Sequence, residues 1–439
     1  GGCKVTTKFD AIIIGAGIIG CATAFELAKK GYQTLNIDKL PEAGYGSTSN
    51  SCGLIRFFYS TWDGVALSYE GYHYWPDWAN YLGLKDERGY ARYVQRGTIM
   101  LKTPGHDHEK VMRLYDQVGV EYEDWDLETL KARAPIYDTG AFWPPKPLED
   151  PGFWDEPEGE LSGAVFTPQS GYVTDPQLAT HNLRRAAEAQ GAQFLFNREV
   201  TEIRQAAGRA LGVTLKDGQQ IDAPVVVNVA GPHSFVVNRM AGVEAGMKIK
   251  TRALRHEVPH VPAPPGFDFE KYGHPTSDGD AGTYFRPEAG NKIAVGTEDP
   301  DCDPREWVDD PDYFKRELTD VHWKSQVYRL AKRIPSLGIP TRRQGVVDLY
   351  DVSDDWIPIY DKSDLQGFYM AIGTSGNQFK NAGVAGHLMA ELIDACEGGH
   401  DHDHDPVQVQ GRYTGLTLNA GAFSRLREIN QDSSFSVRG

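Results

Sequence analysis

The feature that most constrains the fold is a glycine-rich turn between a predicted strand and a predicted helix. Residues 9–14, FDAIII, are apolar and β-branched, which is typical of a short buried strand. The helix that follows ends at Gly31, and a second predicted strand, 32–39, contains Asp38 near its end. This order predicts a βαβ unit that binds a dinucleotide. The turn itself fits G-x-G-x-x-G and consists of Gly15, Ala16, Gly17, Ile18, Ile19 and Gly20.

Each part of this unit suits one part of a dinucleotide. The glycines let the backbone approach a pyrophosphate, whose charge the helix N-terminus stabilises. Asp38 can accept hydrogen bonds from ribose hydroxyls, and its charge disfavours the 2′-phosphate of NADP. We therefore expect Asp38 and its neighbour Lys39 to contact the cofactor, with FAD and NAD both open at this point.

Two later stretches favour FAD over NAD. VVVNVAG, residues 225–231, is a hydrophobic strand running into a turn at Ala230 and Gly231, which in flavoproteins returns the chain to the dinucleotide. IGTSGNQF, residues 372–379, is a second glycine loop before a second helix, whose N-terminus can stabilise the negative charge of reduced flavin. The further predicted cofactor contacts are Val200, Gly373, Thr374, Gly376, Gln378 and Phe379.

Composition bounds the class of protein. The 439 residues, 40% of them hydrophobic, suffice for two domains. The sequence contains no run of about 18 apolar residues, so no membrane span is predicted. A net charge of −16 argues against a nucleic-acid partner. The odd number of scattered cysteines favours a reducing compartment, here taken as the cytoplasm, with neither disulfides nor zinc. These cysteines are Cys3, Cys21, Cys52, Cys302 and Cys396.

Two unusual segments have no assigned role in this scheme. Residues 135–159 are rich in proline, glycine, tryptophan and acid, which predicts a long loop, either docked on the surface or acting as a lid. HDHDHD, residues 400–405, alternates metal-capable side chains, but its spacing on a loop fixes no geometry. We interpret it as a solvated loop and predict no metal site.

The remaining pattern predicts a mixed fold. We expect an α/β architecture in which a Rossmann-like FAD-binding domain accompanies an α+β substrate domain built on an antiparallel sheet. Residues 9–85, 160–245 and 340–430 are assigned to the first domain, and residues 86–159 and 246–339 to the second. Helices are predicted at 67–84, 106–134, 175–193 and 312–334, and strands at 90–101, 194–204 and across 246–300.

Five motifs together resemble the D-amino-acid oxidase-like superfamily of FAD enzymes, and within it the sarcosine oxidase, dimethylglycine dehydrogenase and glycine oxidase branch. They occur in the family's order and cover most of the chain. These motifs are FDAIIIGAGIIG, GSTSNSCGLIR (46–56), SGAVFTPQSGYVTDPQLATHNLRRAAEAQGAQF, VVVNVAG and SGNQFKNAGVAGHLMAELI.

The resemblance gives the loop at 46–56 a role, because in these families the corresponding segment wraps the flavin. Dimethylglycine dehydrogenase-like relatives carry a covalent histidine link where this chain has Asn50, and sarcosine oxidase-like relatives use a cysteine that aligns near Val347. Neither residue can form the bond, so we expect non-covalent FAD. The flavin contacts implied for this loop are Gly46, Ser47, Thr48, Ser49, Asn50 and Ser51.

The resemblance also implies how substrate is held. In sarcosine oxidase-like enzymes an arginine and a lysine matching Arg56 and Lys380 clamp the substrate carboxylate over the flavin. The alternative is that both are surface cations. Asn377 and Tyr284 complete the predicted catalytic set, and Arg286 either lines the cavity with Tyr284 or belongs to the core.

A lysine that assists oxygen in sarcosine oxidase-like enzymes aligns with Ala294 here, with Lys292 two residues earlier on the same strand face. The electron acceptor therefore stays open between oxygen and an electron carrier, and the oligomeric state is not predicted.

The sequence thus predicts oxidation of the C–N bond of an amino acid or N-methylated amino acid by hydride transfer to flavin N5, giving an imine that hydrolyses. Two alternatives stay open. One is oxidation of the C–OH bond of a hydroxy acid or polyol, and the other is a non-catalytic flavin subunit of a larger complex.

Overall fold

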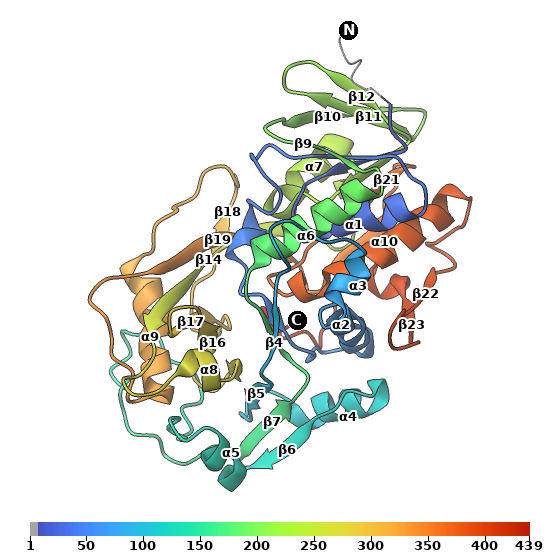
Figure 1. The fold of residues 1–439 in the computed structure, drawn as a ribbon. Coiled ribbons are helices and arrows are strands. Elements are labelled where there is room, and N and C mark those ends of the chain that lie inside the picture. Colours follow the sequence, from blue (N-terminus) through green and yellow to red (C-terminus); the bar gives the residue numbers. More distant parts are fainter. Residues whose placement is uncertain (1–7) are drawn as a thin grey trace.

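The computed structural model describes residues 8–439, except for the side chains of Ser49 and Asn50, and has two lobes, each built on one large sheet (Figure 1). The first lobe holds a six-stranded sheet whose neighbours are parallel except for the β20–β21 pair. Its strands come from early, middle and late parts of the chain, so the lobe is discontinuous in sequence. In sheet order they are β20 (Ile359–Lys362), β21 (Phe368–Ile372), β13 (Val225–Asn228), β1 (Ala11–Ile14), β2 (Thr34–Ile37) and β9 (Gln193–Leu195).

The central strands of this sheet are buried on both faces, which explains their continuous runs of apolar residues. Helix α1 (Ile18–Lys29) packs against both α6 (Pro176–Ala189) and α10 (Ala382–Glu397), as Figure 1 shows. Helix α6 begins as predicted, because the Asp175 carboxylate accepts a hydrogen bond from the amide of Leu178 at 2.9 Å.

The second lobe holds a mostly antiparallel nine-stranded sheet. Its longest member, β14, pairs with β19 from Thr251 opposite Ser353 to Pro259 opposite Gly345. The strands are β18 (Glu306–Val308), β14 (Thr251–Pro262), β17 (Lys292–Thr297), β16 (Thr283–Glu288), β15 (Thr276–Asp278), β5 (Thr98–Leu101), β7 (Gly163–Thr167), β6 (Glu123–Asp126) and β19 (Gly345–Ser353). The lobe's helices are α5 (Leu127–Arg133), α8 (Phe269–Tyr272) and α9 (Asp320–Arg333), whereas α4 (His108–Val118) packs against α2 (Trp62–His73) and shares the core of the first lobe.

Smaller elements complete the chain. The helices are α2 (Trp62–His73), α3 (Trp78–Leu82) and α7 (Ser234–Ala241). Three small antiparallel sheets comprise β10 (Val200–Ala206), β11 (Arg209–Leu215) and β12 (Gln220–Asp222); β3 (Leu54–Ile55), β8 (Gly171–Val173) and β4 (Tyr93–Gln95); and β22 (Gln408–Gln410) with β23 (Thr417–Asn419).

The predicted fold class is confirmed, with a Rossmann-like parallel sheet in one lobe and a mainly antiparallel sheet in the other. Four predicted segments differ from expectation. Two of them are divided, the helix predicted at 67–84 into α2 and α3, and the strand predicted at 90–101 into β4 and β5. The helix predicted from residue 312 begins only at Asp320, where Thr319 caps it, and strand β6 interrupts the predicted helical stretch 106–134. The domain boundaries stay a prediction, but β7 and β19 lie inside the ranges assigned to the FAD-binding domain and pair in the other sheet.

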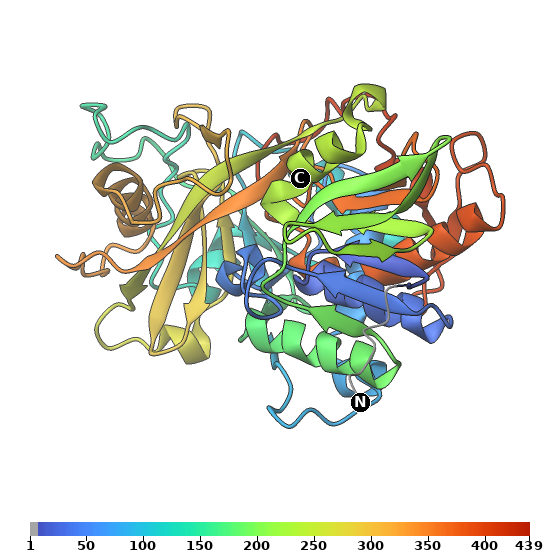
Figure 2. The same cartoon turned by 90° about the horizontal axis from the view of Figure 1, so that it is seen from above.

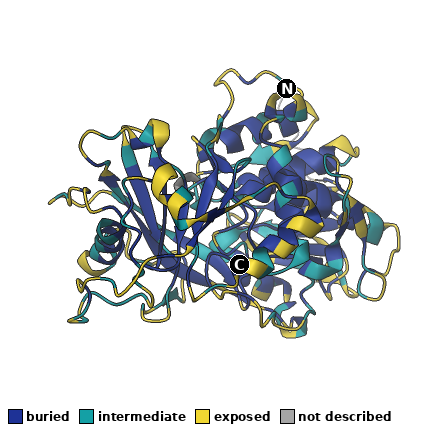
Figure 3. Cartoon of the chain, turned by 90° about the horizontal axis from the view of Figure 1, so that it is seen from below, coloured by how far each residue is buried: buried dark blue, intermediate teal, exposed yellow. Residues whose placement is uncertain are grey.

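The last residues, 433–439, lie between the lobes, near the middle of the molecule in both views (Figures 1 and 2). The strands around them are buried, whereas exposed residues gather on outer turns and loops (Figure 3). Among the helices of the described residues, none is long and apolar enough to cross a membrane.

Candidate functional site

A cavity lies where segments of both lobes meet. Its volume is about 1320 Å³, which includes the solvent-filled space at its opening. Its wall combines the first turn of α1 with the loops at 47–58, 229–232 and 371–380, strands of the nine-stranded sheet, and residues 437–438. The structure therefore brings the two glycine turns, from opposite ends of the sequence, to one cavity.

The N-terminus of α1 forms one end of this cavity. Gly17, Ile18, Ile19 and Gly20 line it, and the N-cap Gly17 has no side chain to occupy the free amides. Thr48 borders the same end, where its hydroxyl accepts a hydrogen bond from the amide of Ile18 at 3.3 Å. An open helix N-terminus of this kind suits a pyrophosphate.

Gly15 explains why the turn can sit so tightly against the sheet. Its φ is +118°, and a Cβ at this position would lie 2.1 Å from the carbonyl oxygen of Val229. Only glycine fits there, because any side chain would push α1 away from the end of β13.

Asp38 and Lys39 make contacts within the protein, and their contact with the cofactor stays a prediction. The Asp38 carboxylate accepts hydrogen bonds from the amides of Ala16 and Leu40, both at 2.9 Å, which fastens the end of β2 to the glycine turn. The Lys39 ammonium pairs with Asp312. Neither residue is part of the cavity wall.

Among the described residues, several others that we predicted to contact the cofactor are not part of the cavity wall. Val200 lies on β10 in a small sheet, and its side chain belongs to the core beneath the parallel sheet. The side chains of Ser49 and Asn50 lie outside the described residues. The others not in the wall are Gly15, Ala16, Gly46, Ala230 and Gly373, whereas Ser47, Thr48, Ser51, Gly231, Thr374, Gly376, Gln378 and Phe379 do line it.

The second glycine loop is held rigidly by its own side chains. Gln378 accepts a hydrogen bond from the Tyr360 hydroxyl at 2.9 Å and donates to the Asn377 side chain at 2.7 Å. The carbonyl of Asn377 in turn accepts hydrogen bonds from the Tyr59 hydroxyl at 2.7 Å and from Lys380 Nζ at 2.5 Å. The loop therefore presents Asn377 and Lys380 to the cavity in a fixed arrangement.

Arg56 is buried in the cavity wall rather than on the surface. Its Nη1 donates to the carbonyls of Phe58 at 2.6 Å and Arg438 at 3.3 Å, and its Nη2 donates to the carbonyl of Val437 at 2.6 Å. A guanidinium has five N–H donors. These three bonds therefore leave two donors, one on Nε and one on Nη2, for a ligand.

Lys380 is fully buried and forms no ion pair with a carboxylate among residues 8–439. Burial lowers the pKa of its ammonium well below the ordinary value, and the nearby charge of Arg56 lowers it further. The ammonium lies 5.0 Å from the centre of the Tyr59 ring. Lys380 is thus a lysine that gives up its proton readily unless an anion enters the cavity.

Tyr284 belongs to a short chain of polar groups along the wall. Its hydroxyl lies 3.5 Å from Cys52 Sγ and 3.3 Å from the Tyr350 hydroxyl. Burial raises the pKa of Tyr284 well above its usual range, so the phenol stays neutral. Arg286, its expected companion, instead lies over the Tyr172 ring and is not part of the wall.

Sequence reasoning missed three charged residues of the wall, Asp351, Glu298 and Arg438. No local motif marks them, because each becomes buried only when distant segments pack together. Asp351 Oδ2 accepts hydrogen bonds from the Gly373 amide at 2.8 Å and the Ser234 hydroxyl at 3.1 Å. Burial raises the pKa of Asp351 to about 7.

The start of α1 provides a test of fit for FAD. Gly17, Ile18, Ile19 and Gly20 line the cavity, and this helix start has no side-chain cap. Backbone amides at a helix N-terminus suit a pyrophosphate, which FAD carries. The residues present therefore fit this group.

Three other expectations concern residues that lie away from the cavity. Ala294 and Lys292 are on β17 and neither lines the wall, nor does Val347 on β19. No residue of 135–159 is among the described lining residues. That segment instead docks on α9, where Arg333 donates to the carbonyls of Asp138 at 2.6 Å and Gly140 at 2.8 Å, which does not support a lid.

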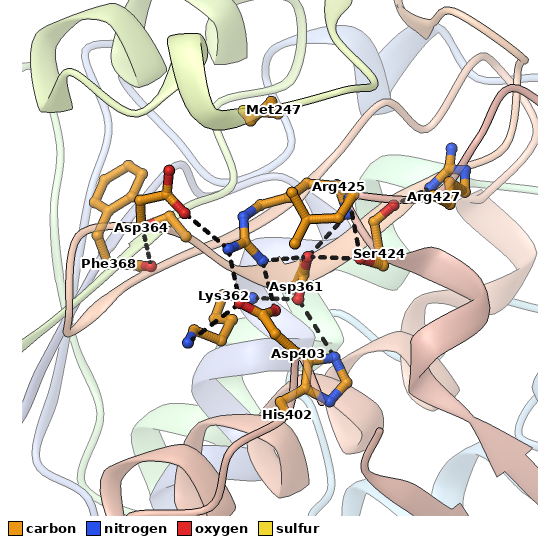
Figure 4. Close-up of polar contacts among 12 residues, drawn as sticks. Met247, Asp361, Lys362, Asp364, Phe368, His402, Asp403, Ser424, Arg425 and Arg427 are labelled. Atoms are coloured by element: carbon orange, nitrogen blue, oxygen red, sulfur yellow. Dashed lines mark hydrogen bonds and ion pairs between the residues drawn. The ribbon is translucent and has the colours of Figure 1, made fainter. Parts of the chain in front are cut away.

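The HDHDHD segment is only partly solvated, contrary to our interpretation (Figure 4). His402 is 2% exposed, and its Nε2 lies 3.3 Å from Asp361 Oδ1. Asp403 and Asp361 both pair with the buried guanidinium of Arg425. His402 and Asp403 therefore fasten the segment to β20, while His400 and His404 stay exposed.

The cysteines and the acidic surface add no second site. Cys21, Cys52, Cys302 and Cys396 are unpaired, and Cys3 lies outside the described residues. Among residues 8–439, one group has the spacing of metal ligands, Asp86, Glu87 and His181, and there His181 already pairs with Asp86 at 2.7 Å.

Comparison with known proteins agrees with this geometry. The family described as FAD dependent oxidoreductase, DAO, matches residues 10–392. Mitochondrial sarcosine dehydrogenase of Homo sapiens is 25% identical over 397 residues, covering 88% of this chain but only 39% of that protein. The chain therefore spans about two fifths of the length of this relative.

Two further comparisons cover whole chains more evenly. Sarcosine oxidase subunit beta of Rhodobacter capsulatus is 25% identical over 394 residues, covering 88% of this chain and 85% of that subunit. The crystal structure of glycine oxidase from Geobacillus kaustophilus superposes with a TM-score of 0.72 at 20% identity, covering 97% of this chain and all of that one. At this identity the structural match concerns the fold.

Proposed function

The chain belongs to the DAO family of FAD-dependent oxidoreductases, and from that premise we propose that it oxidises the C–N bond of an amino acid or N-methylated amino acid. The family match and the sarcosine dehydrogenase and sarcosine oxidase relatives confirm the superfamily and FAD as its cofactor. The observation that carries the finer proposal is a buried cation, Arg56, with two free N–H donors in the wall of the cavity that holds both glycine turns.

Different residues of the chain bind the cofactor and the substrate in this proposal. The amides at the start of α1 hold the pyrophosphate, and the loop at 373–380 borders the other side of the cavity. Bound FAD supplies a hydride acceptor. Arg56 binds the substrate carboxylate through its remaining donors, which fixes the orientation of the C–H bond to be broken.

Lys380 supplies the proton chemistry in this proposal. An amino acid enters with an ammonium group, but hydride leaves only from the neutral amine. The substrate carboxylate raises the affinity of the buried Lys380 Nζ for a proton, because it adds a negative charge beside a desolvated amine. Lys380 then takes the ammonium proton, while the neutral phenol of Tyr284 and the surrounding apolar side chains exclude water.

Anaerobic titration of the FAD-loaded protein tests this function. The panel contains N-methyl, secondary and primary amino acids and, for each, the hydroxy acid with the same carbon skeleton. We expect loss of the yellow flavin absorbance with amino acids alone. Bleaching only by hydroxy acids would support C–OH oxidation, and bleaching by neither class would support a non-catalytic flavin subunit; either result contradicts the proposal.

Air admitted after bleaching then identifies the class of acceptor. Rapid return of the colour indicates an oxidase, and slow return indicates a dehydrogenase that passes electrons to a carrier.

A further inference from the structure

Residues 437 and 438 place a second arginine in the wall of the cavity. Arg438 is 6% exposed and lines the wall, as does Val437. The backbone carbonyls of these two residues accept the hydrogen bonds of Arg56 described above, so the segment is fixed in the wall. In Figures 1 and 2 the same residues lie between the lobes.

The two guanidinium groups are held by one aromatic ring. The central carbon of Arg56 lies 4.1 Å from the centre of the Phe58 ring, and that of Arg438 lies 5.0 Å from it. Each charge is partly stabilised by the ring, but the two repel each other in a site with little water. Two cations this close form a strongly positive patch that favours anions.

Arg438 lacks the partners that a buried guanidinium normally has. Its Nη2 donates to Met100 Sδ at 3.4 Å, and its Nη1 contacts His106, whose pKa burial and Arg438 lower to about 2, so that this ring is neutral. The carboxylate facing it belongs to Glu298, whose Oε2 lies 3.8 Å from Nη1.

Glu298 neutralises Arg438 only weakly. Its Oε2 has no hydrogen-bond partner among the described residues, although the carboxylate is buried and lines the cavity. Burial raises the pKa of Glu298, which favours the uncharged acid. Both groups of this pair therefore have unused hydrogen-bonding capacity, and Arg438 and Glu298 both belong to the cavity wall.

Another arginine of the same protein shows what full pairing looks like. Arg333 is also completely buried, but its guanidinium contacts Asp278 at 2.8 Å and Asp280 at 3.1 Å and donates to two carbonyls. Arg333 is a structural cation that needs no ligand. Arg438 differs because its guanidinium has one carboxylate nearby, at 3.8 Å.

We infer that Arg438 is a specificity-determining residue that binds a second carboxylate of the substrate, so that the substrate class is dicarboxylic amino acids, including those whose second carboxylate is carried on the amine nitrogen. This rests on the proposed function, in which Arg56 binds the first carboxylate. The second carboxylate supplies Arg438 with the close anionic partner that Glu298, at 3.8 Å, does not provide.

Binding of ligands that cannot be oxidised tests the inference. The probes are succinate, glutarate and adipate, each compared with the monocarboxylate of equal length, and the dissociation constant is read from the shift of the flavin spectrum of the FAD-loaded protein. We expect at least one diacid to bind about tenfold or more tighter than its matched monoacid. Equal affinity across all three pairs would overturn the inference.

Variants then assign the effect to Arg438. Arg438→Gln should remove most of the preference for the diacid while leaving monoacid affinity within about twofold, and Arg438→Lys should restore part of it. Arg113→Gln removes one positive charge from the exposed face of α4 and serves as the matched control, with no expected change. Equal weakening of diacid and monoacid by Arg438→Gln would contradict the role.

The outcome is separable from the proposed function. None of these probes has a C–N bond, so a diacid preference that depends on Arg438 stands even if amino acids fail to bleach the flavin. Conversely, bleaching by monocarboxylic amino acids without any diacid preference would support the proposed function and refute this inference. If Arg438→Gln fails to fold, the wild-type comparison and Arg438→Lys still decide it.

Discussion

Arg56 Nη2 donates a hydrogen bond to the carbonyl of Val437 at 2.6 Å, although 381 positions separate the two residues in sequence. The contact fixes Val437 and Arg438 in the cavity wall beside Arg56, the cation that we predict binds the substrate carboxylate. We therefore assign Arg56 two tasks. Its three hydrogen bonds hold backbone in place, and its two remaining donors are proposed to bind a ligand carboxylate.

Replacing Arg56 separates these tasks from flavin binding. In Arg56→Gln we expect KM for a carboxylated amino acid to rise by about tenfold to a hundredfold, since a hydrogen bond to a charged group contributes about 1.5–3 kcal/mol. FAD content should stay normal, because Arg56 is not one of the residues proposed to hold the pyrophosphate.

Hydrogen exchange provides the second readout for this variant. Amides of residues 433–439 should exchange faster, because the segment loses its anchor. Arg113→Gln is the control. Unchanged KM together with unchanged exchange would show that Arg56 is neither a ligand nor an anchor.

The glycine turn at Gly15 should be intolerant of a single methyl group. In Gly15→Ala the new Cβ would lie 2.1 Å from the Val229 carbonyl oxygen, and the φ of +118° is unfavourable for alanine. We expect loss of most bound FAD and a fall of about 1–3 kcal/mol in the free energy of unfolding.

Gly31→Ala is the matched control for Gly15→Ala. Gly31 has a φ of +95° but open space around its Cβ position. This variant should lose about 1 kcal/mol or less of stability and keep its FAD. Equal FAD affinity in the Gly15 variant and the wild type would mean that the close approach of α1 to β13 does not shape the cofactor site.

Asp351 predicts a specific pH dependence of stability. Its pKa is raised by burial from 3.8 to about 7. At a pH between these two values the Asp351 carboxyl is therefore protonated in the folded FAD-free protein and ionised in the unfolded chain. The corresponding stability is present below pH about 4 and is lost as the pH rises to about 7, by up to about 4 kcal/mol.

Asp351→Asn should remove this contribution. Urea unfolding of the FAD-free proteins across that pH range should show the variant gaining stability relative to the wild type as the pH rises. Parallel profiles for the two proteins would contradict the assignment of a buried, readily protonated carboxyl at this position.

FAD should leave the protein when it unfolds. Cys52 is the one cysteine among the described residues of the cavity wall, burial raises its pKa, and a neutral thiol is a poor nucleophile. Acid precipitation of the FAD-loaded protein should therefore release yellow flavin into the supernatant. Flavin retained in the washed pellet would show a covalent link, and Cys52 would then be the candidate attachment residue.

Local sequence determines what could be predicted. The unit β1–α1–β2 follows from apolar runs, a glycine turn and a helix stop that lie within 30 residues of one another, and the helix α6 follows from Asp175 and Pro176 at its start. The cavity residues Arg56, Lys380 and Asn377 were found because recognisable motifs contain them.

The features that could not be predicted from the sequence depend on long-range packing. Arg438 meets His106 and Arg56 across more than 330 positions, and Glu298 follows a strand without any motif. The aromatic loop at 135–159 left docking on the surface and a lid both open; in the structure Arg333 on α9 binds its carbonyls, and no local pattern links those two segments. His402 is buried for the same kind of reason, through Asp361 on β20.

A crystal structure of the FAD-loaded protein with a bound amino-acid analogue tests the central claim most directly. The account predicts the flavin ring between the first turn of α1 and the loop at 373–380, with a ligand carboxylate within hydrogen-bond distance of Arg56. A flavin bound outside this cavity, or a carboxylate that contacts neither Arg56 nor Lys380, would contradict it.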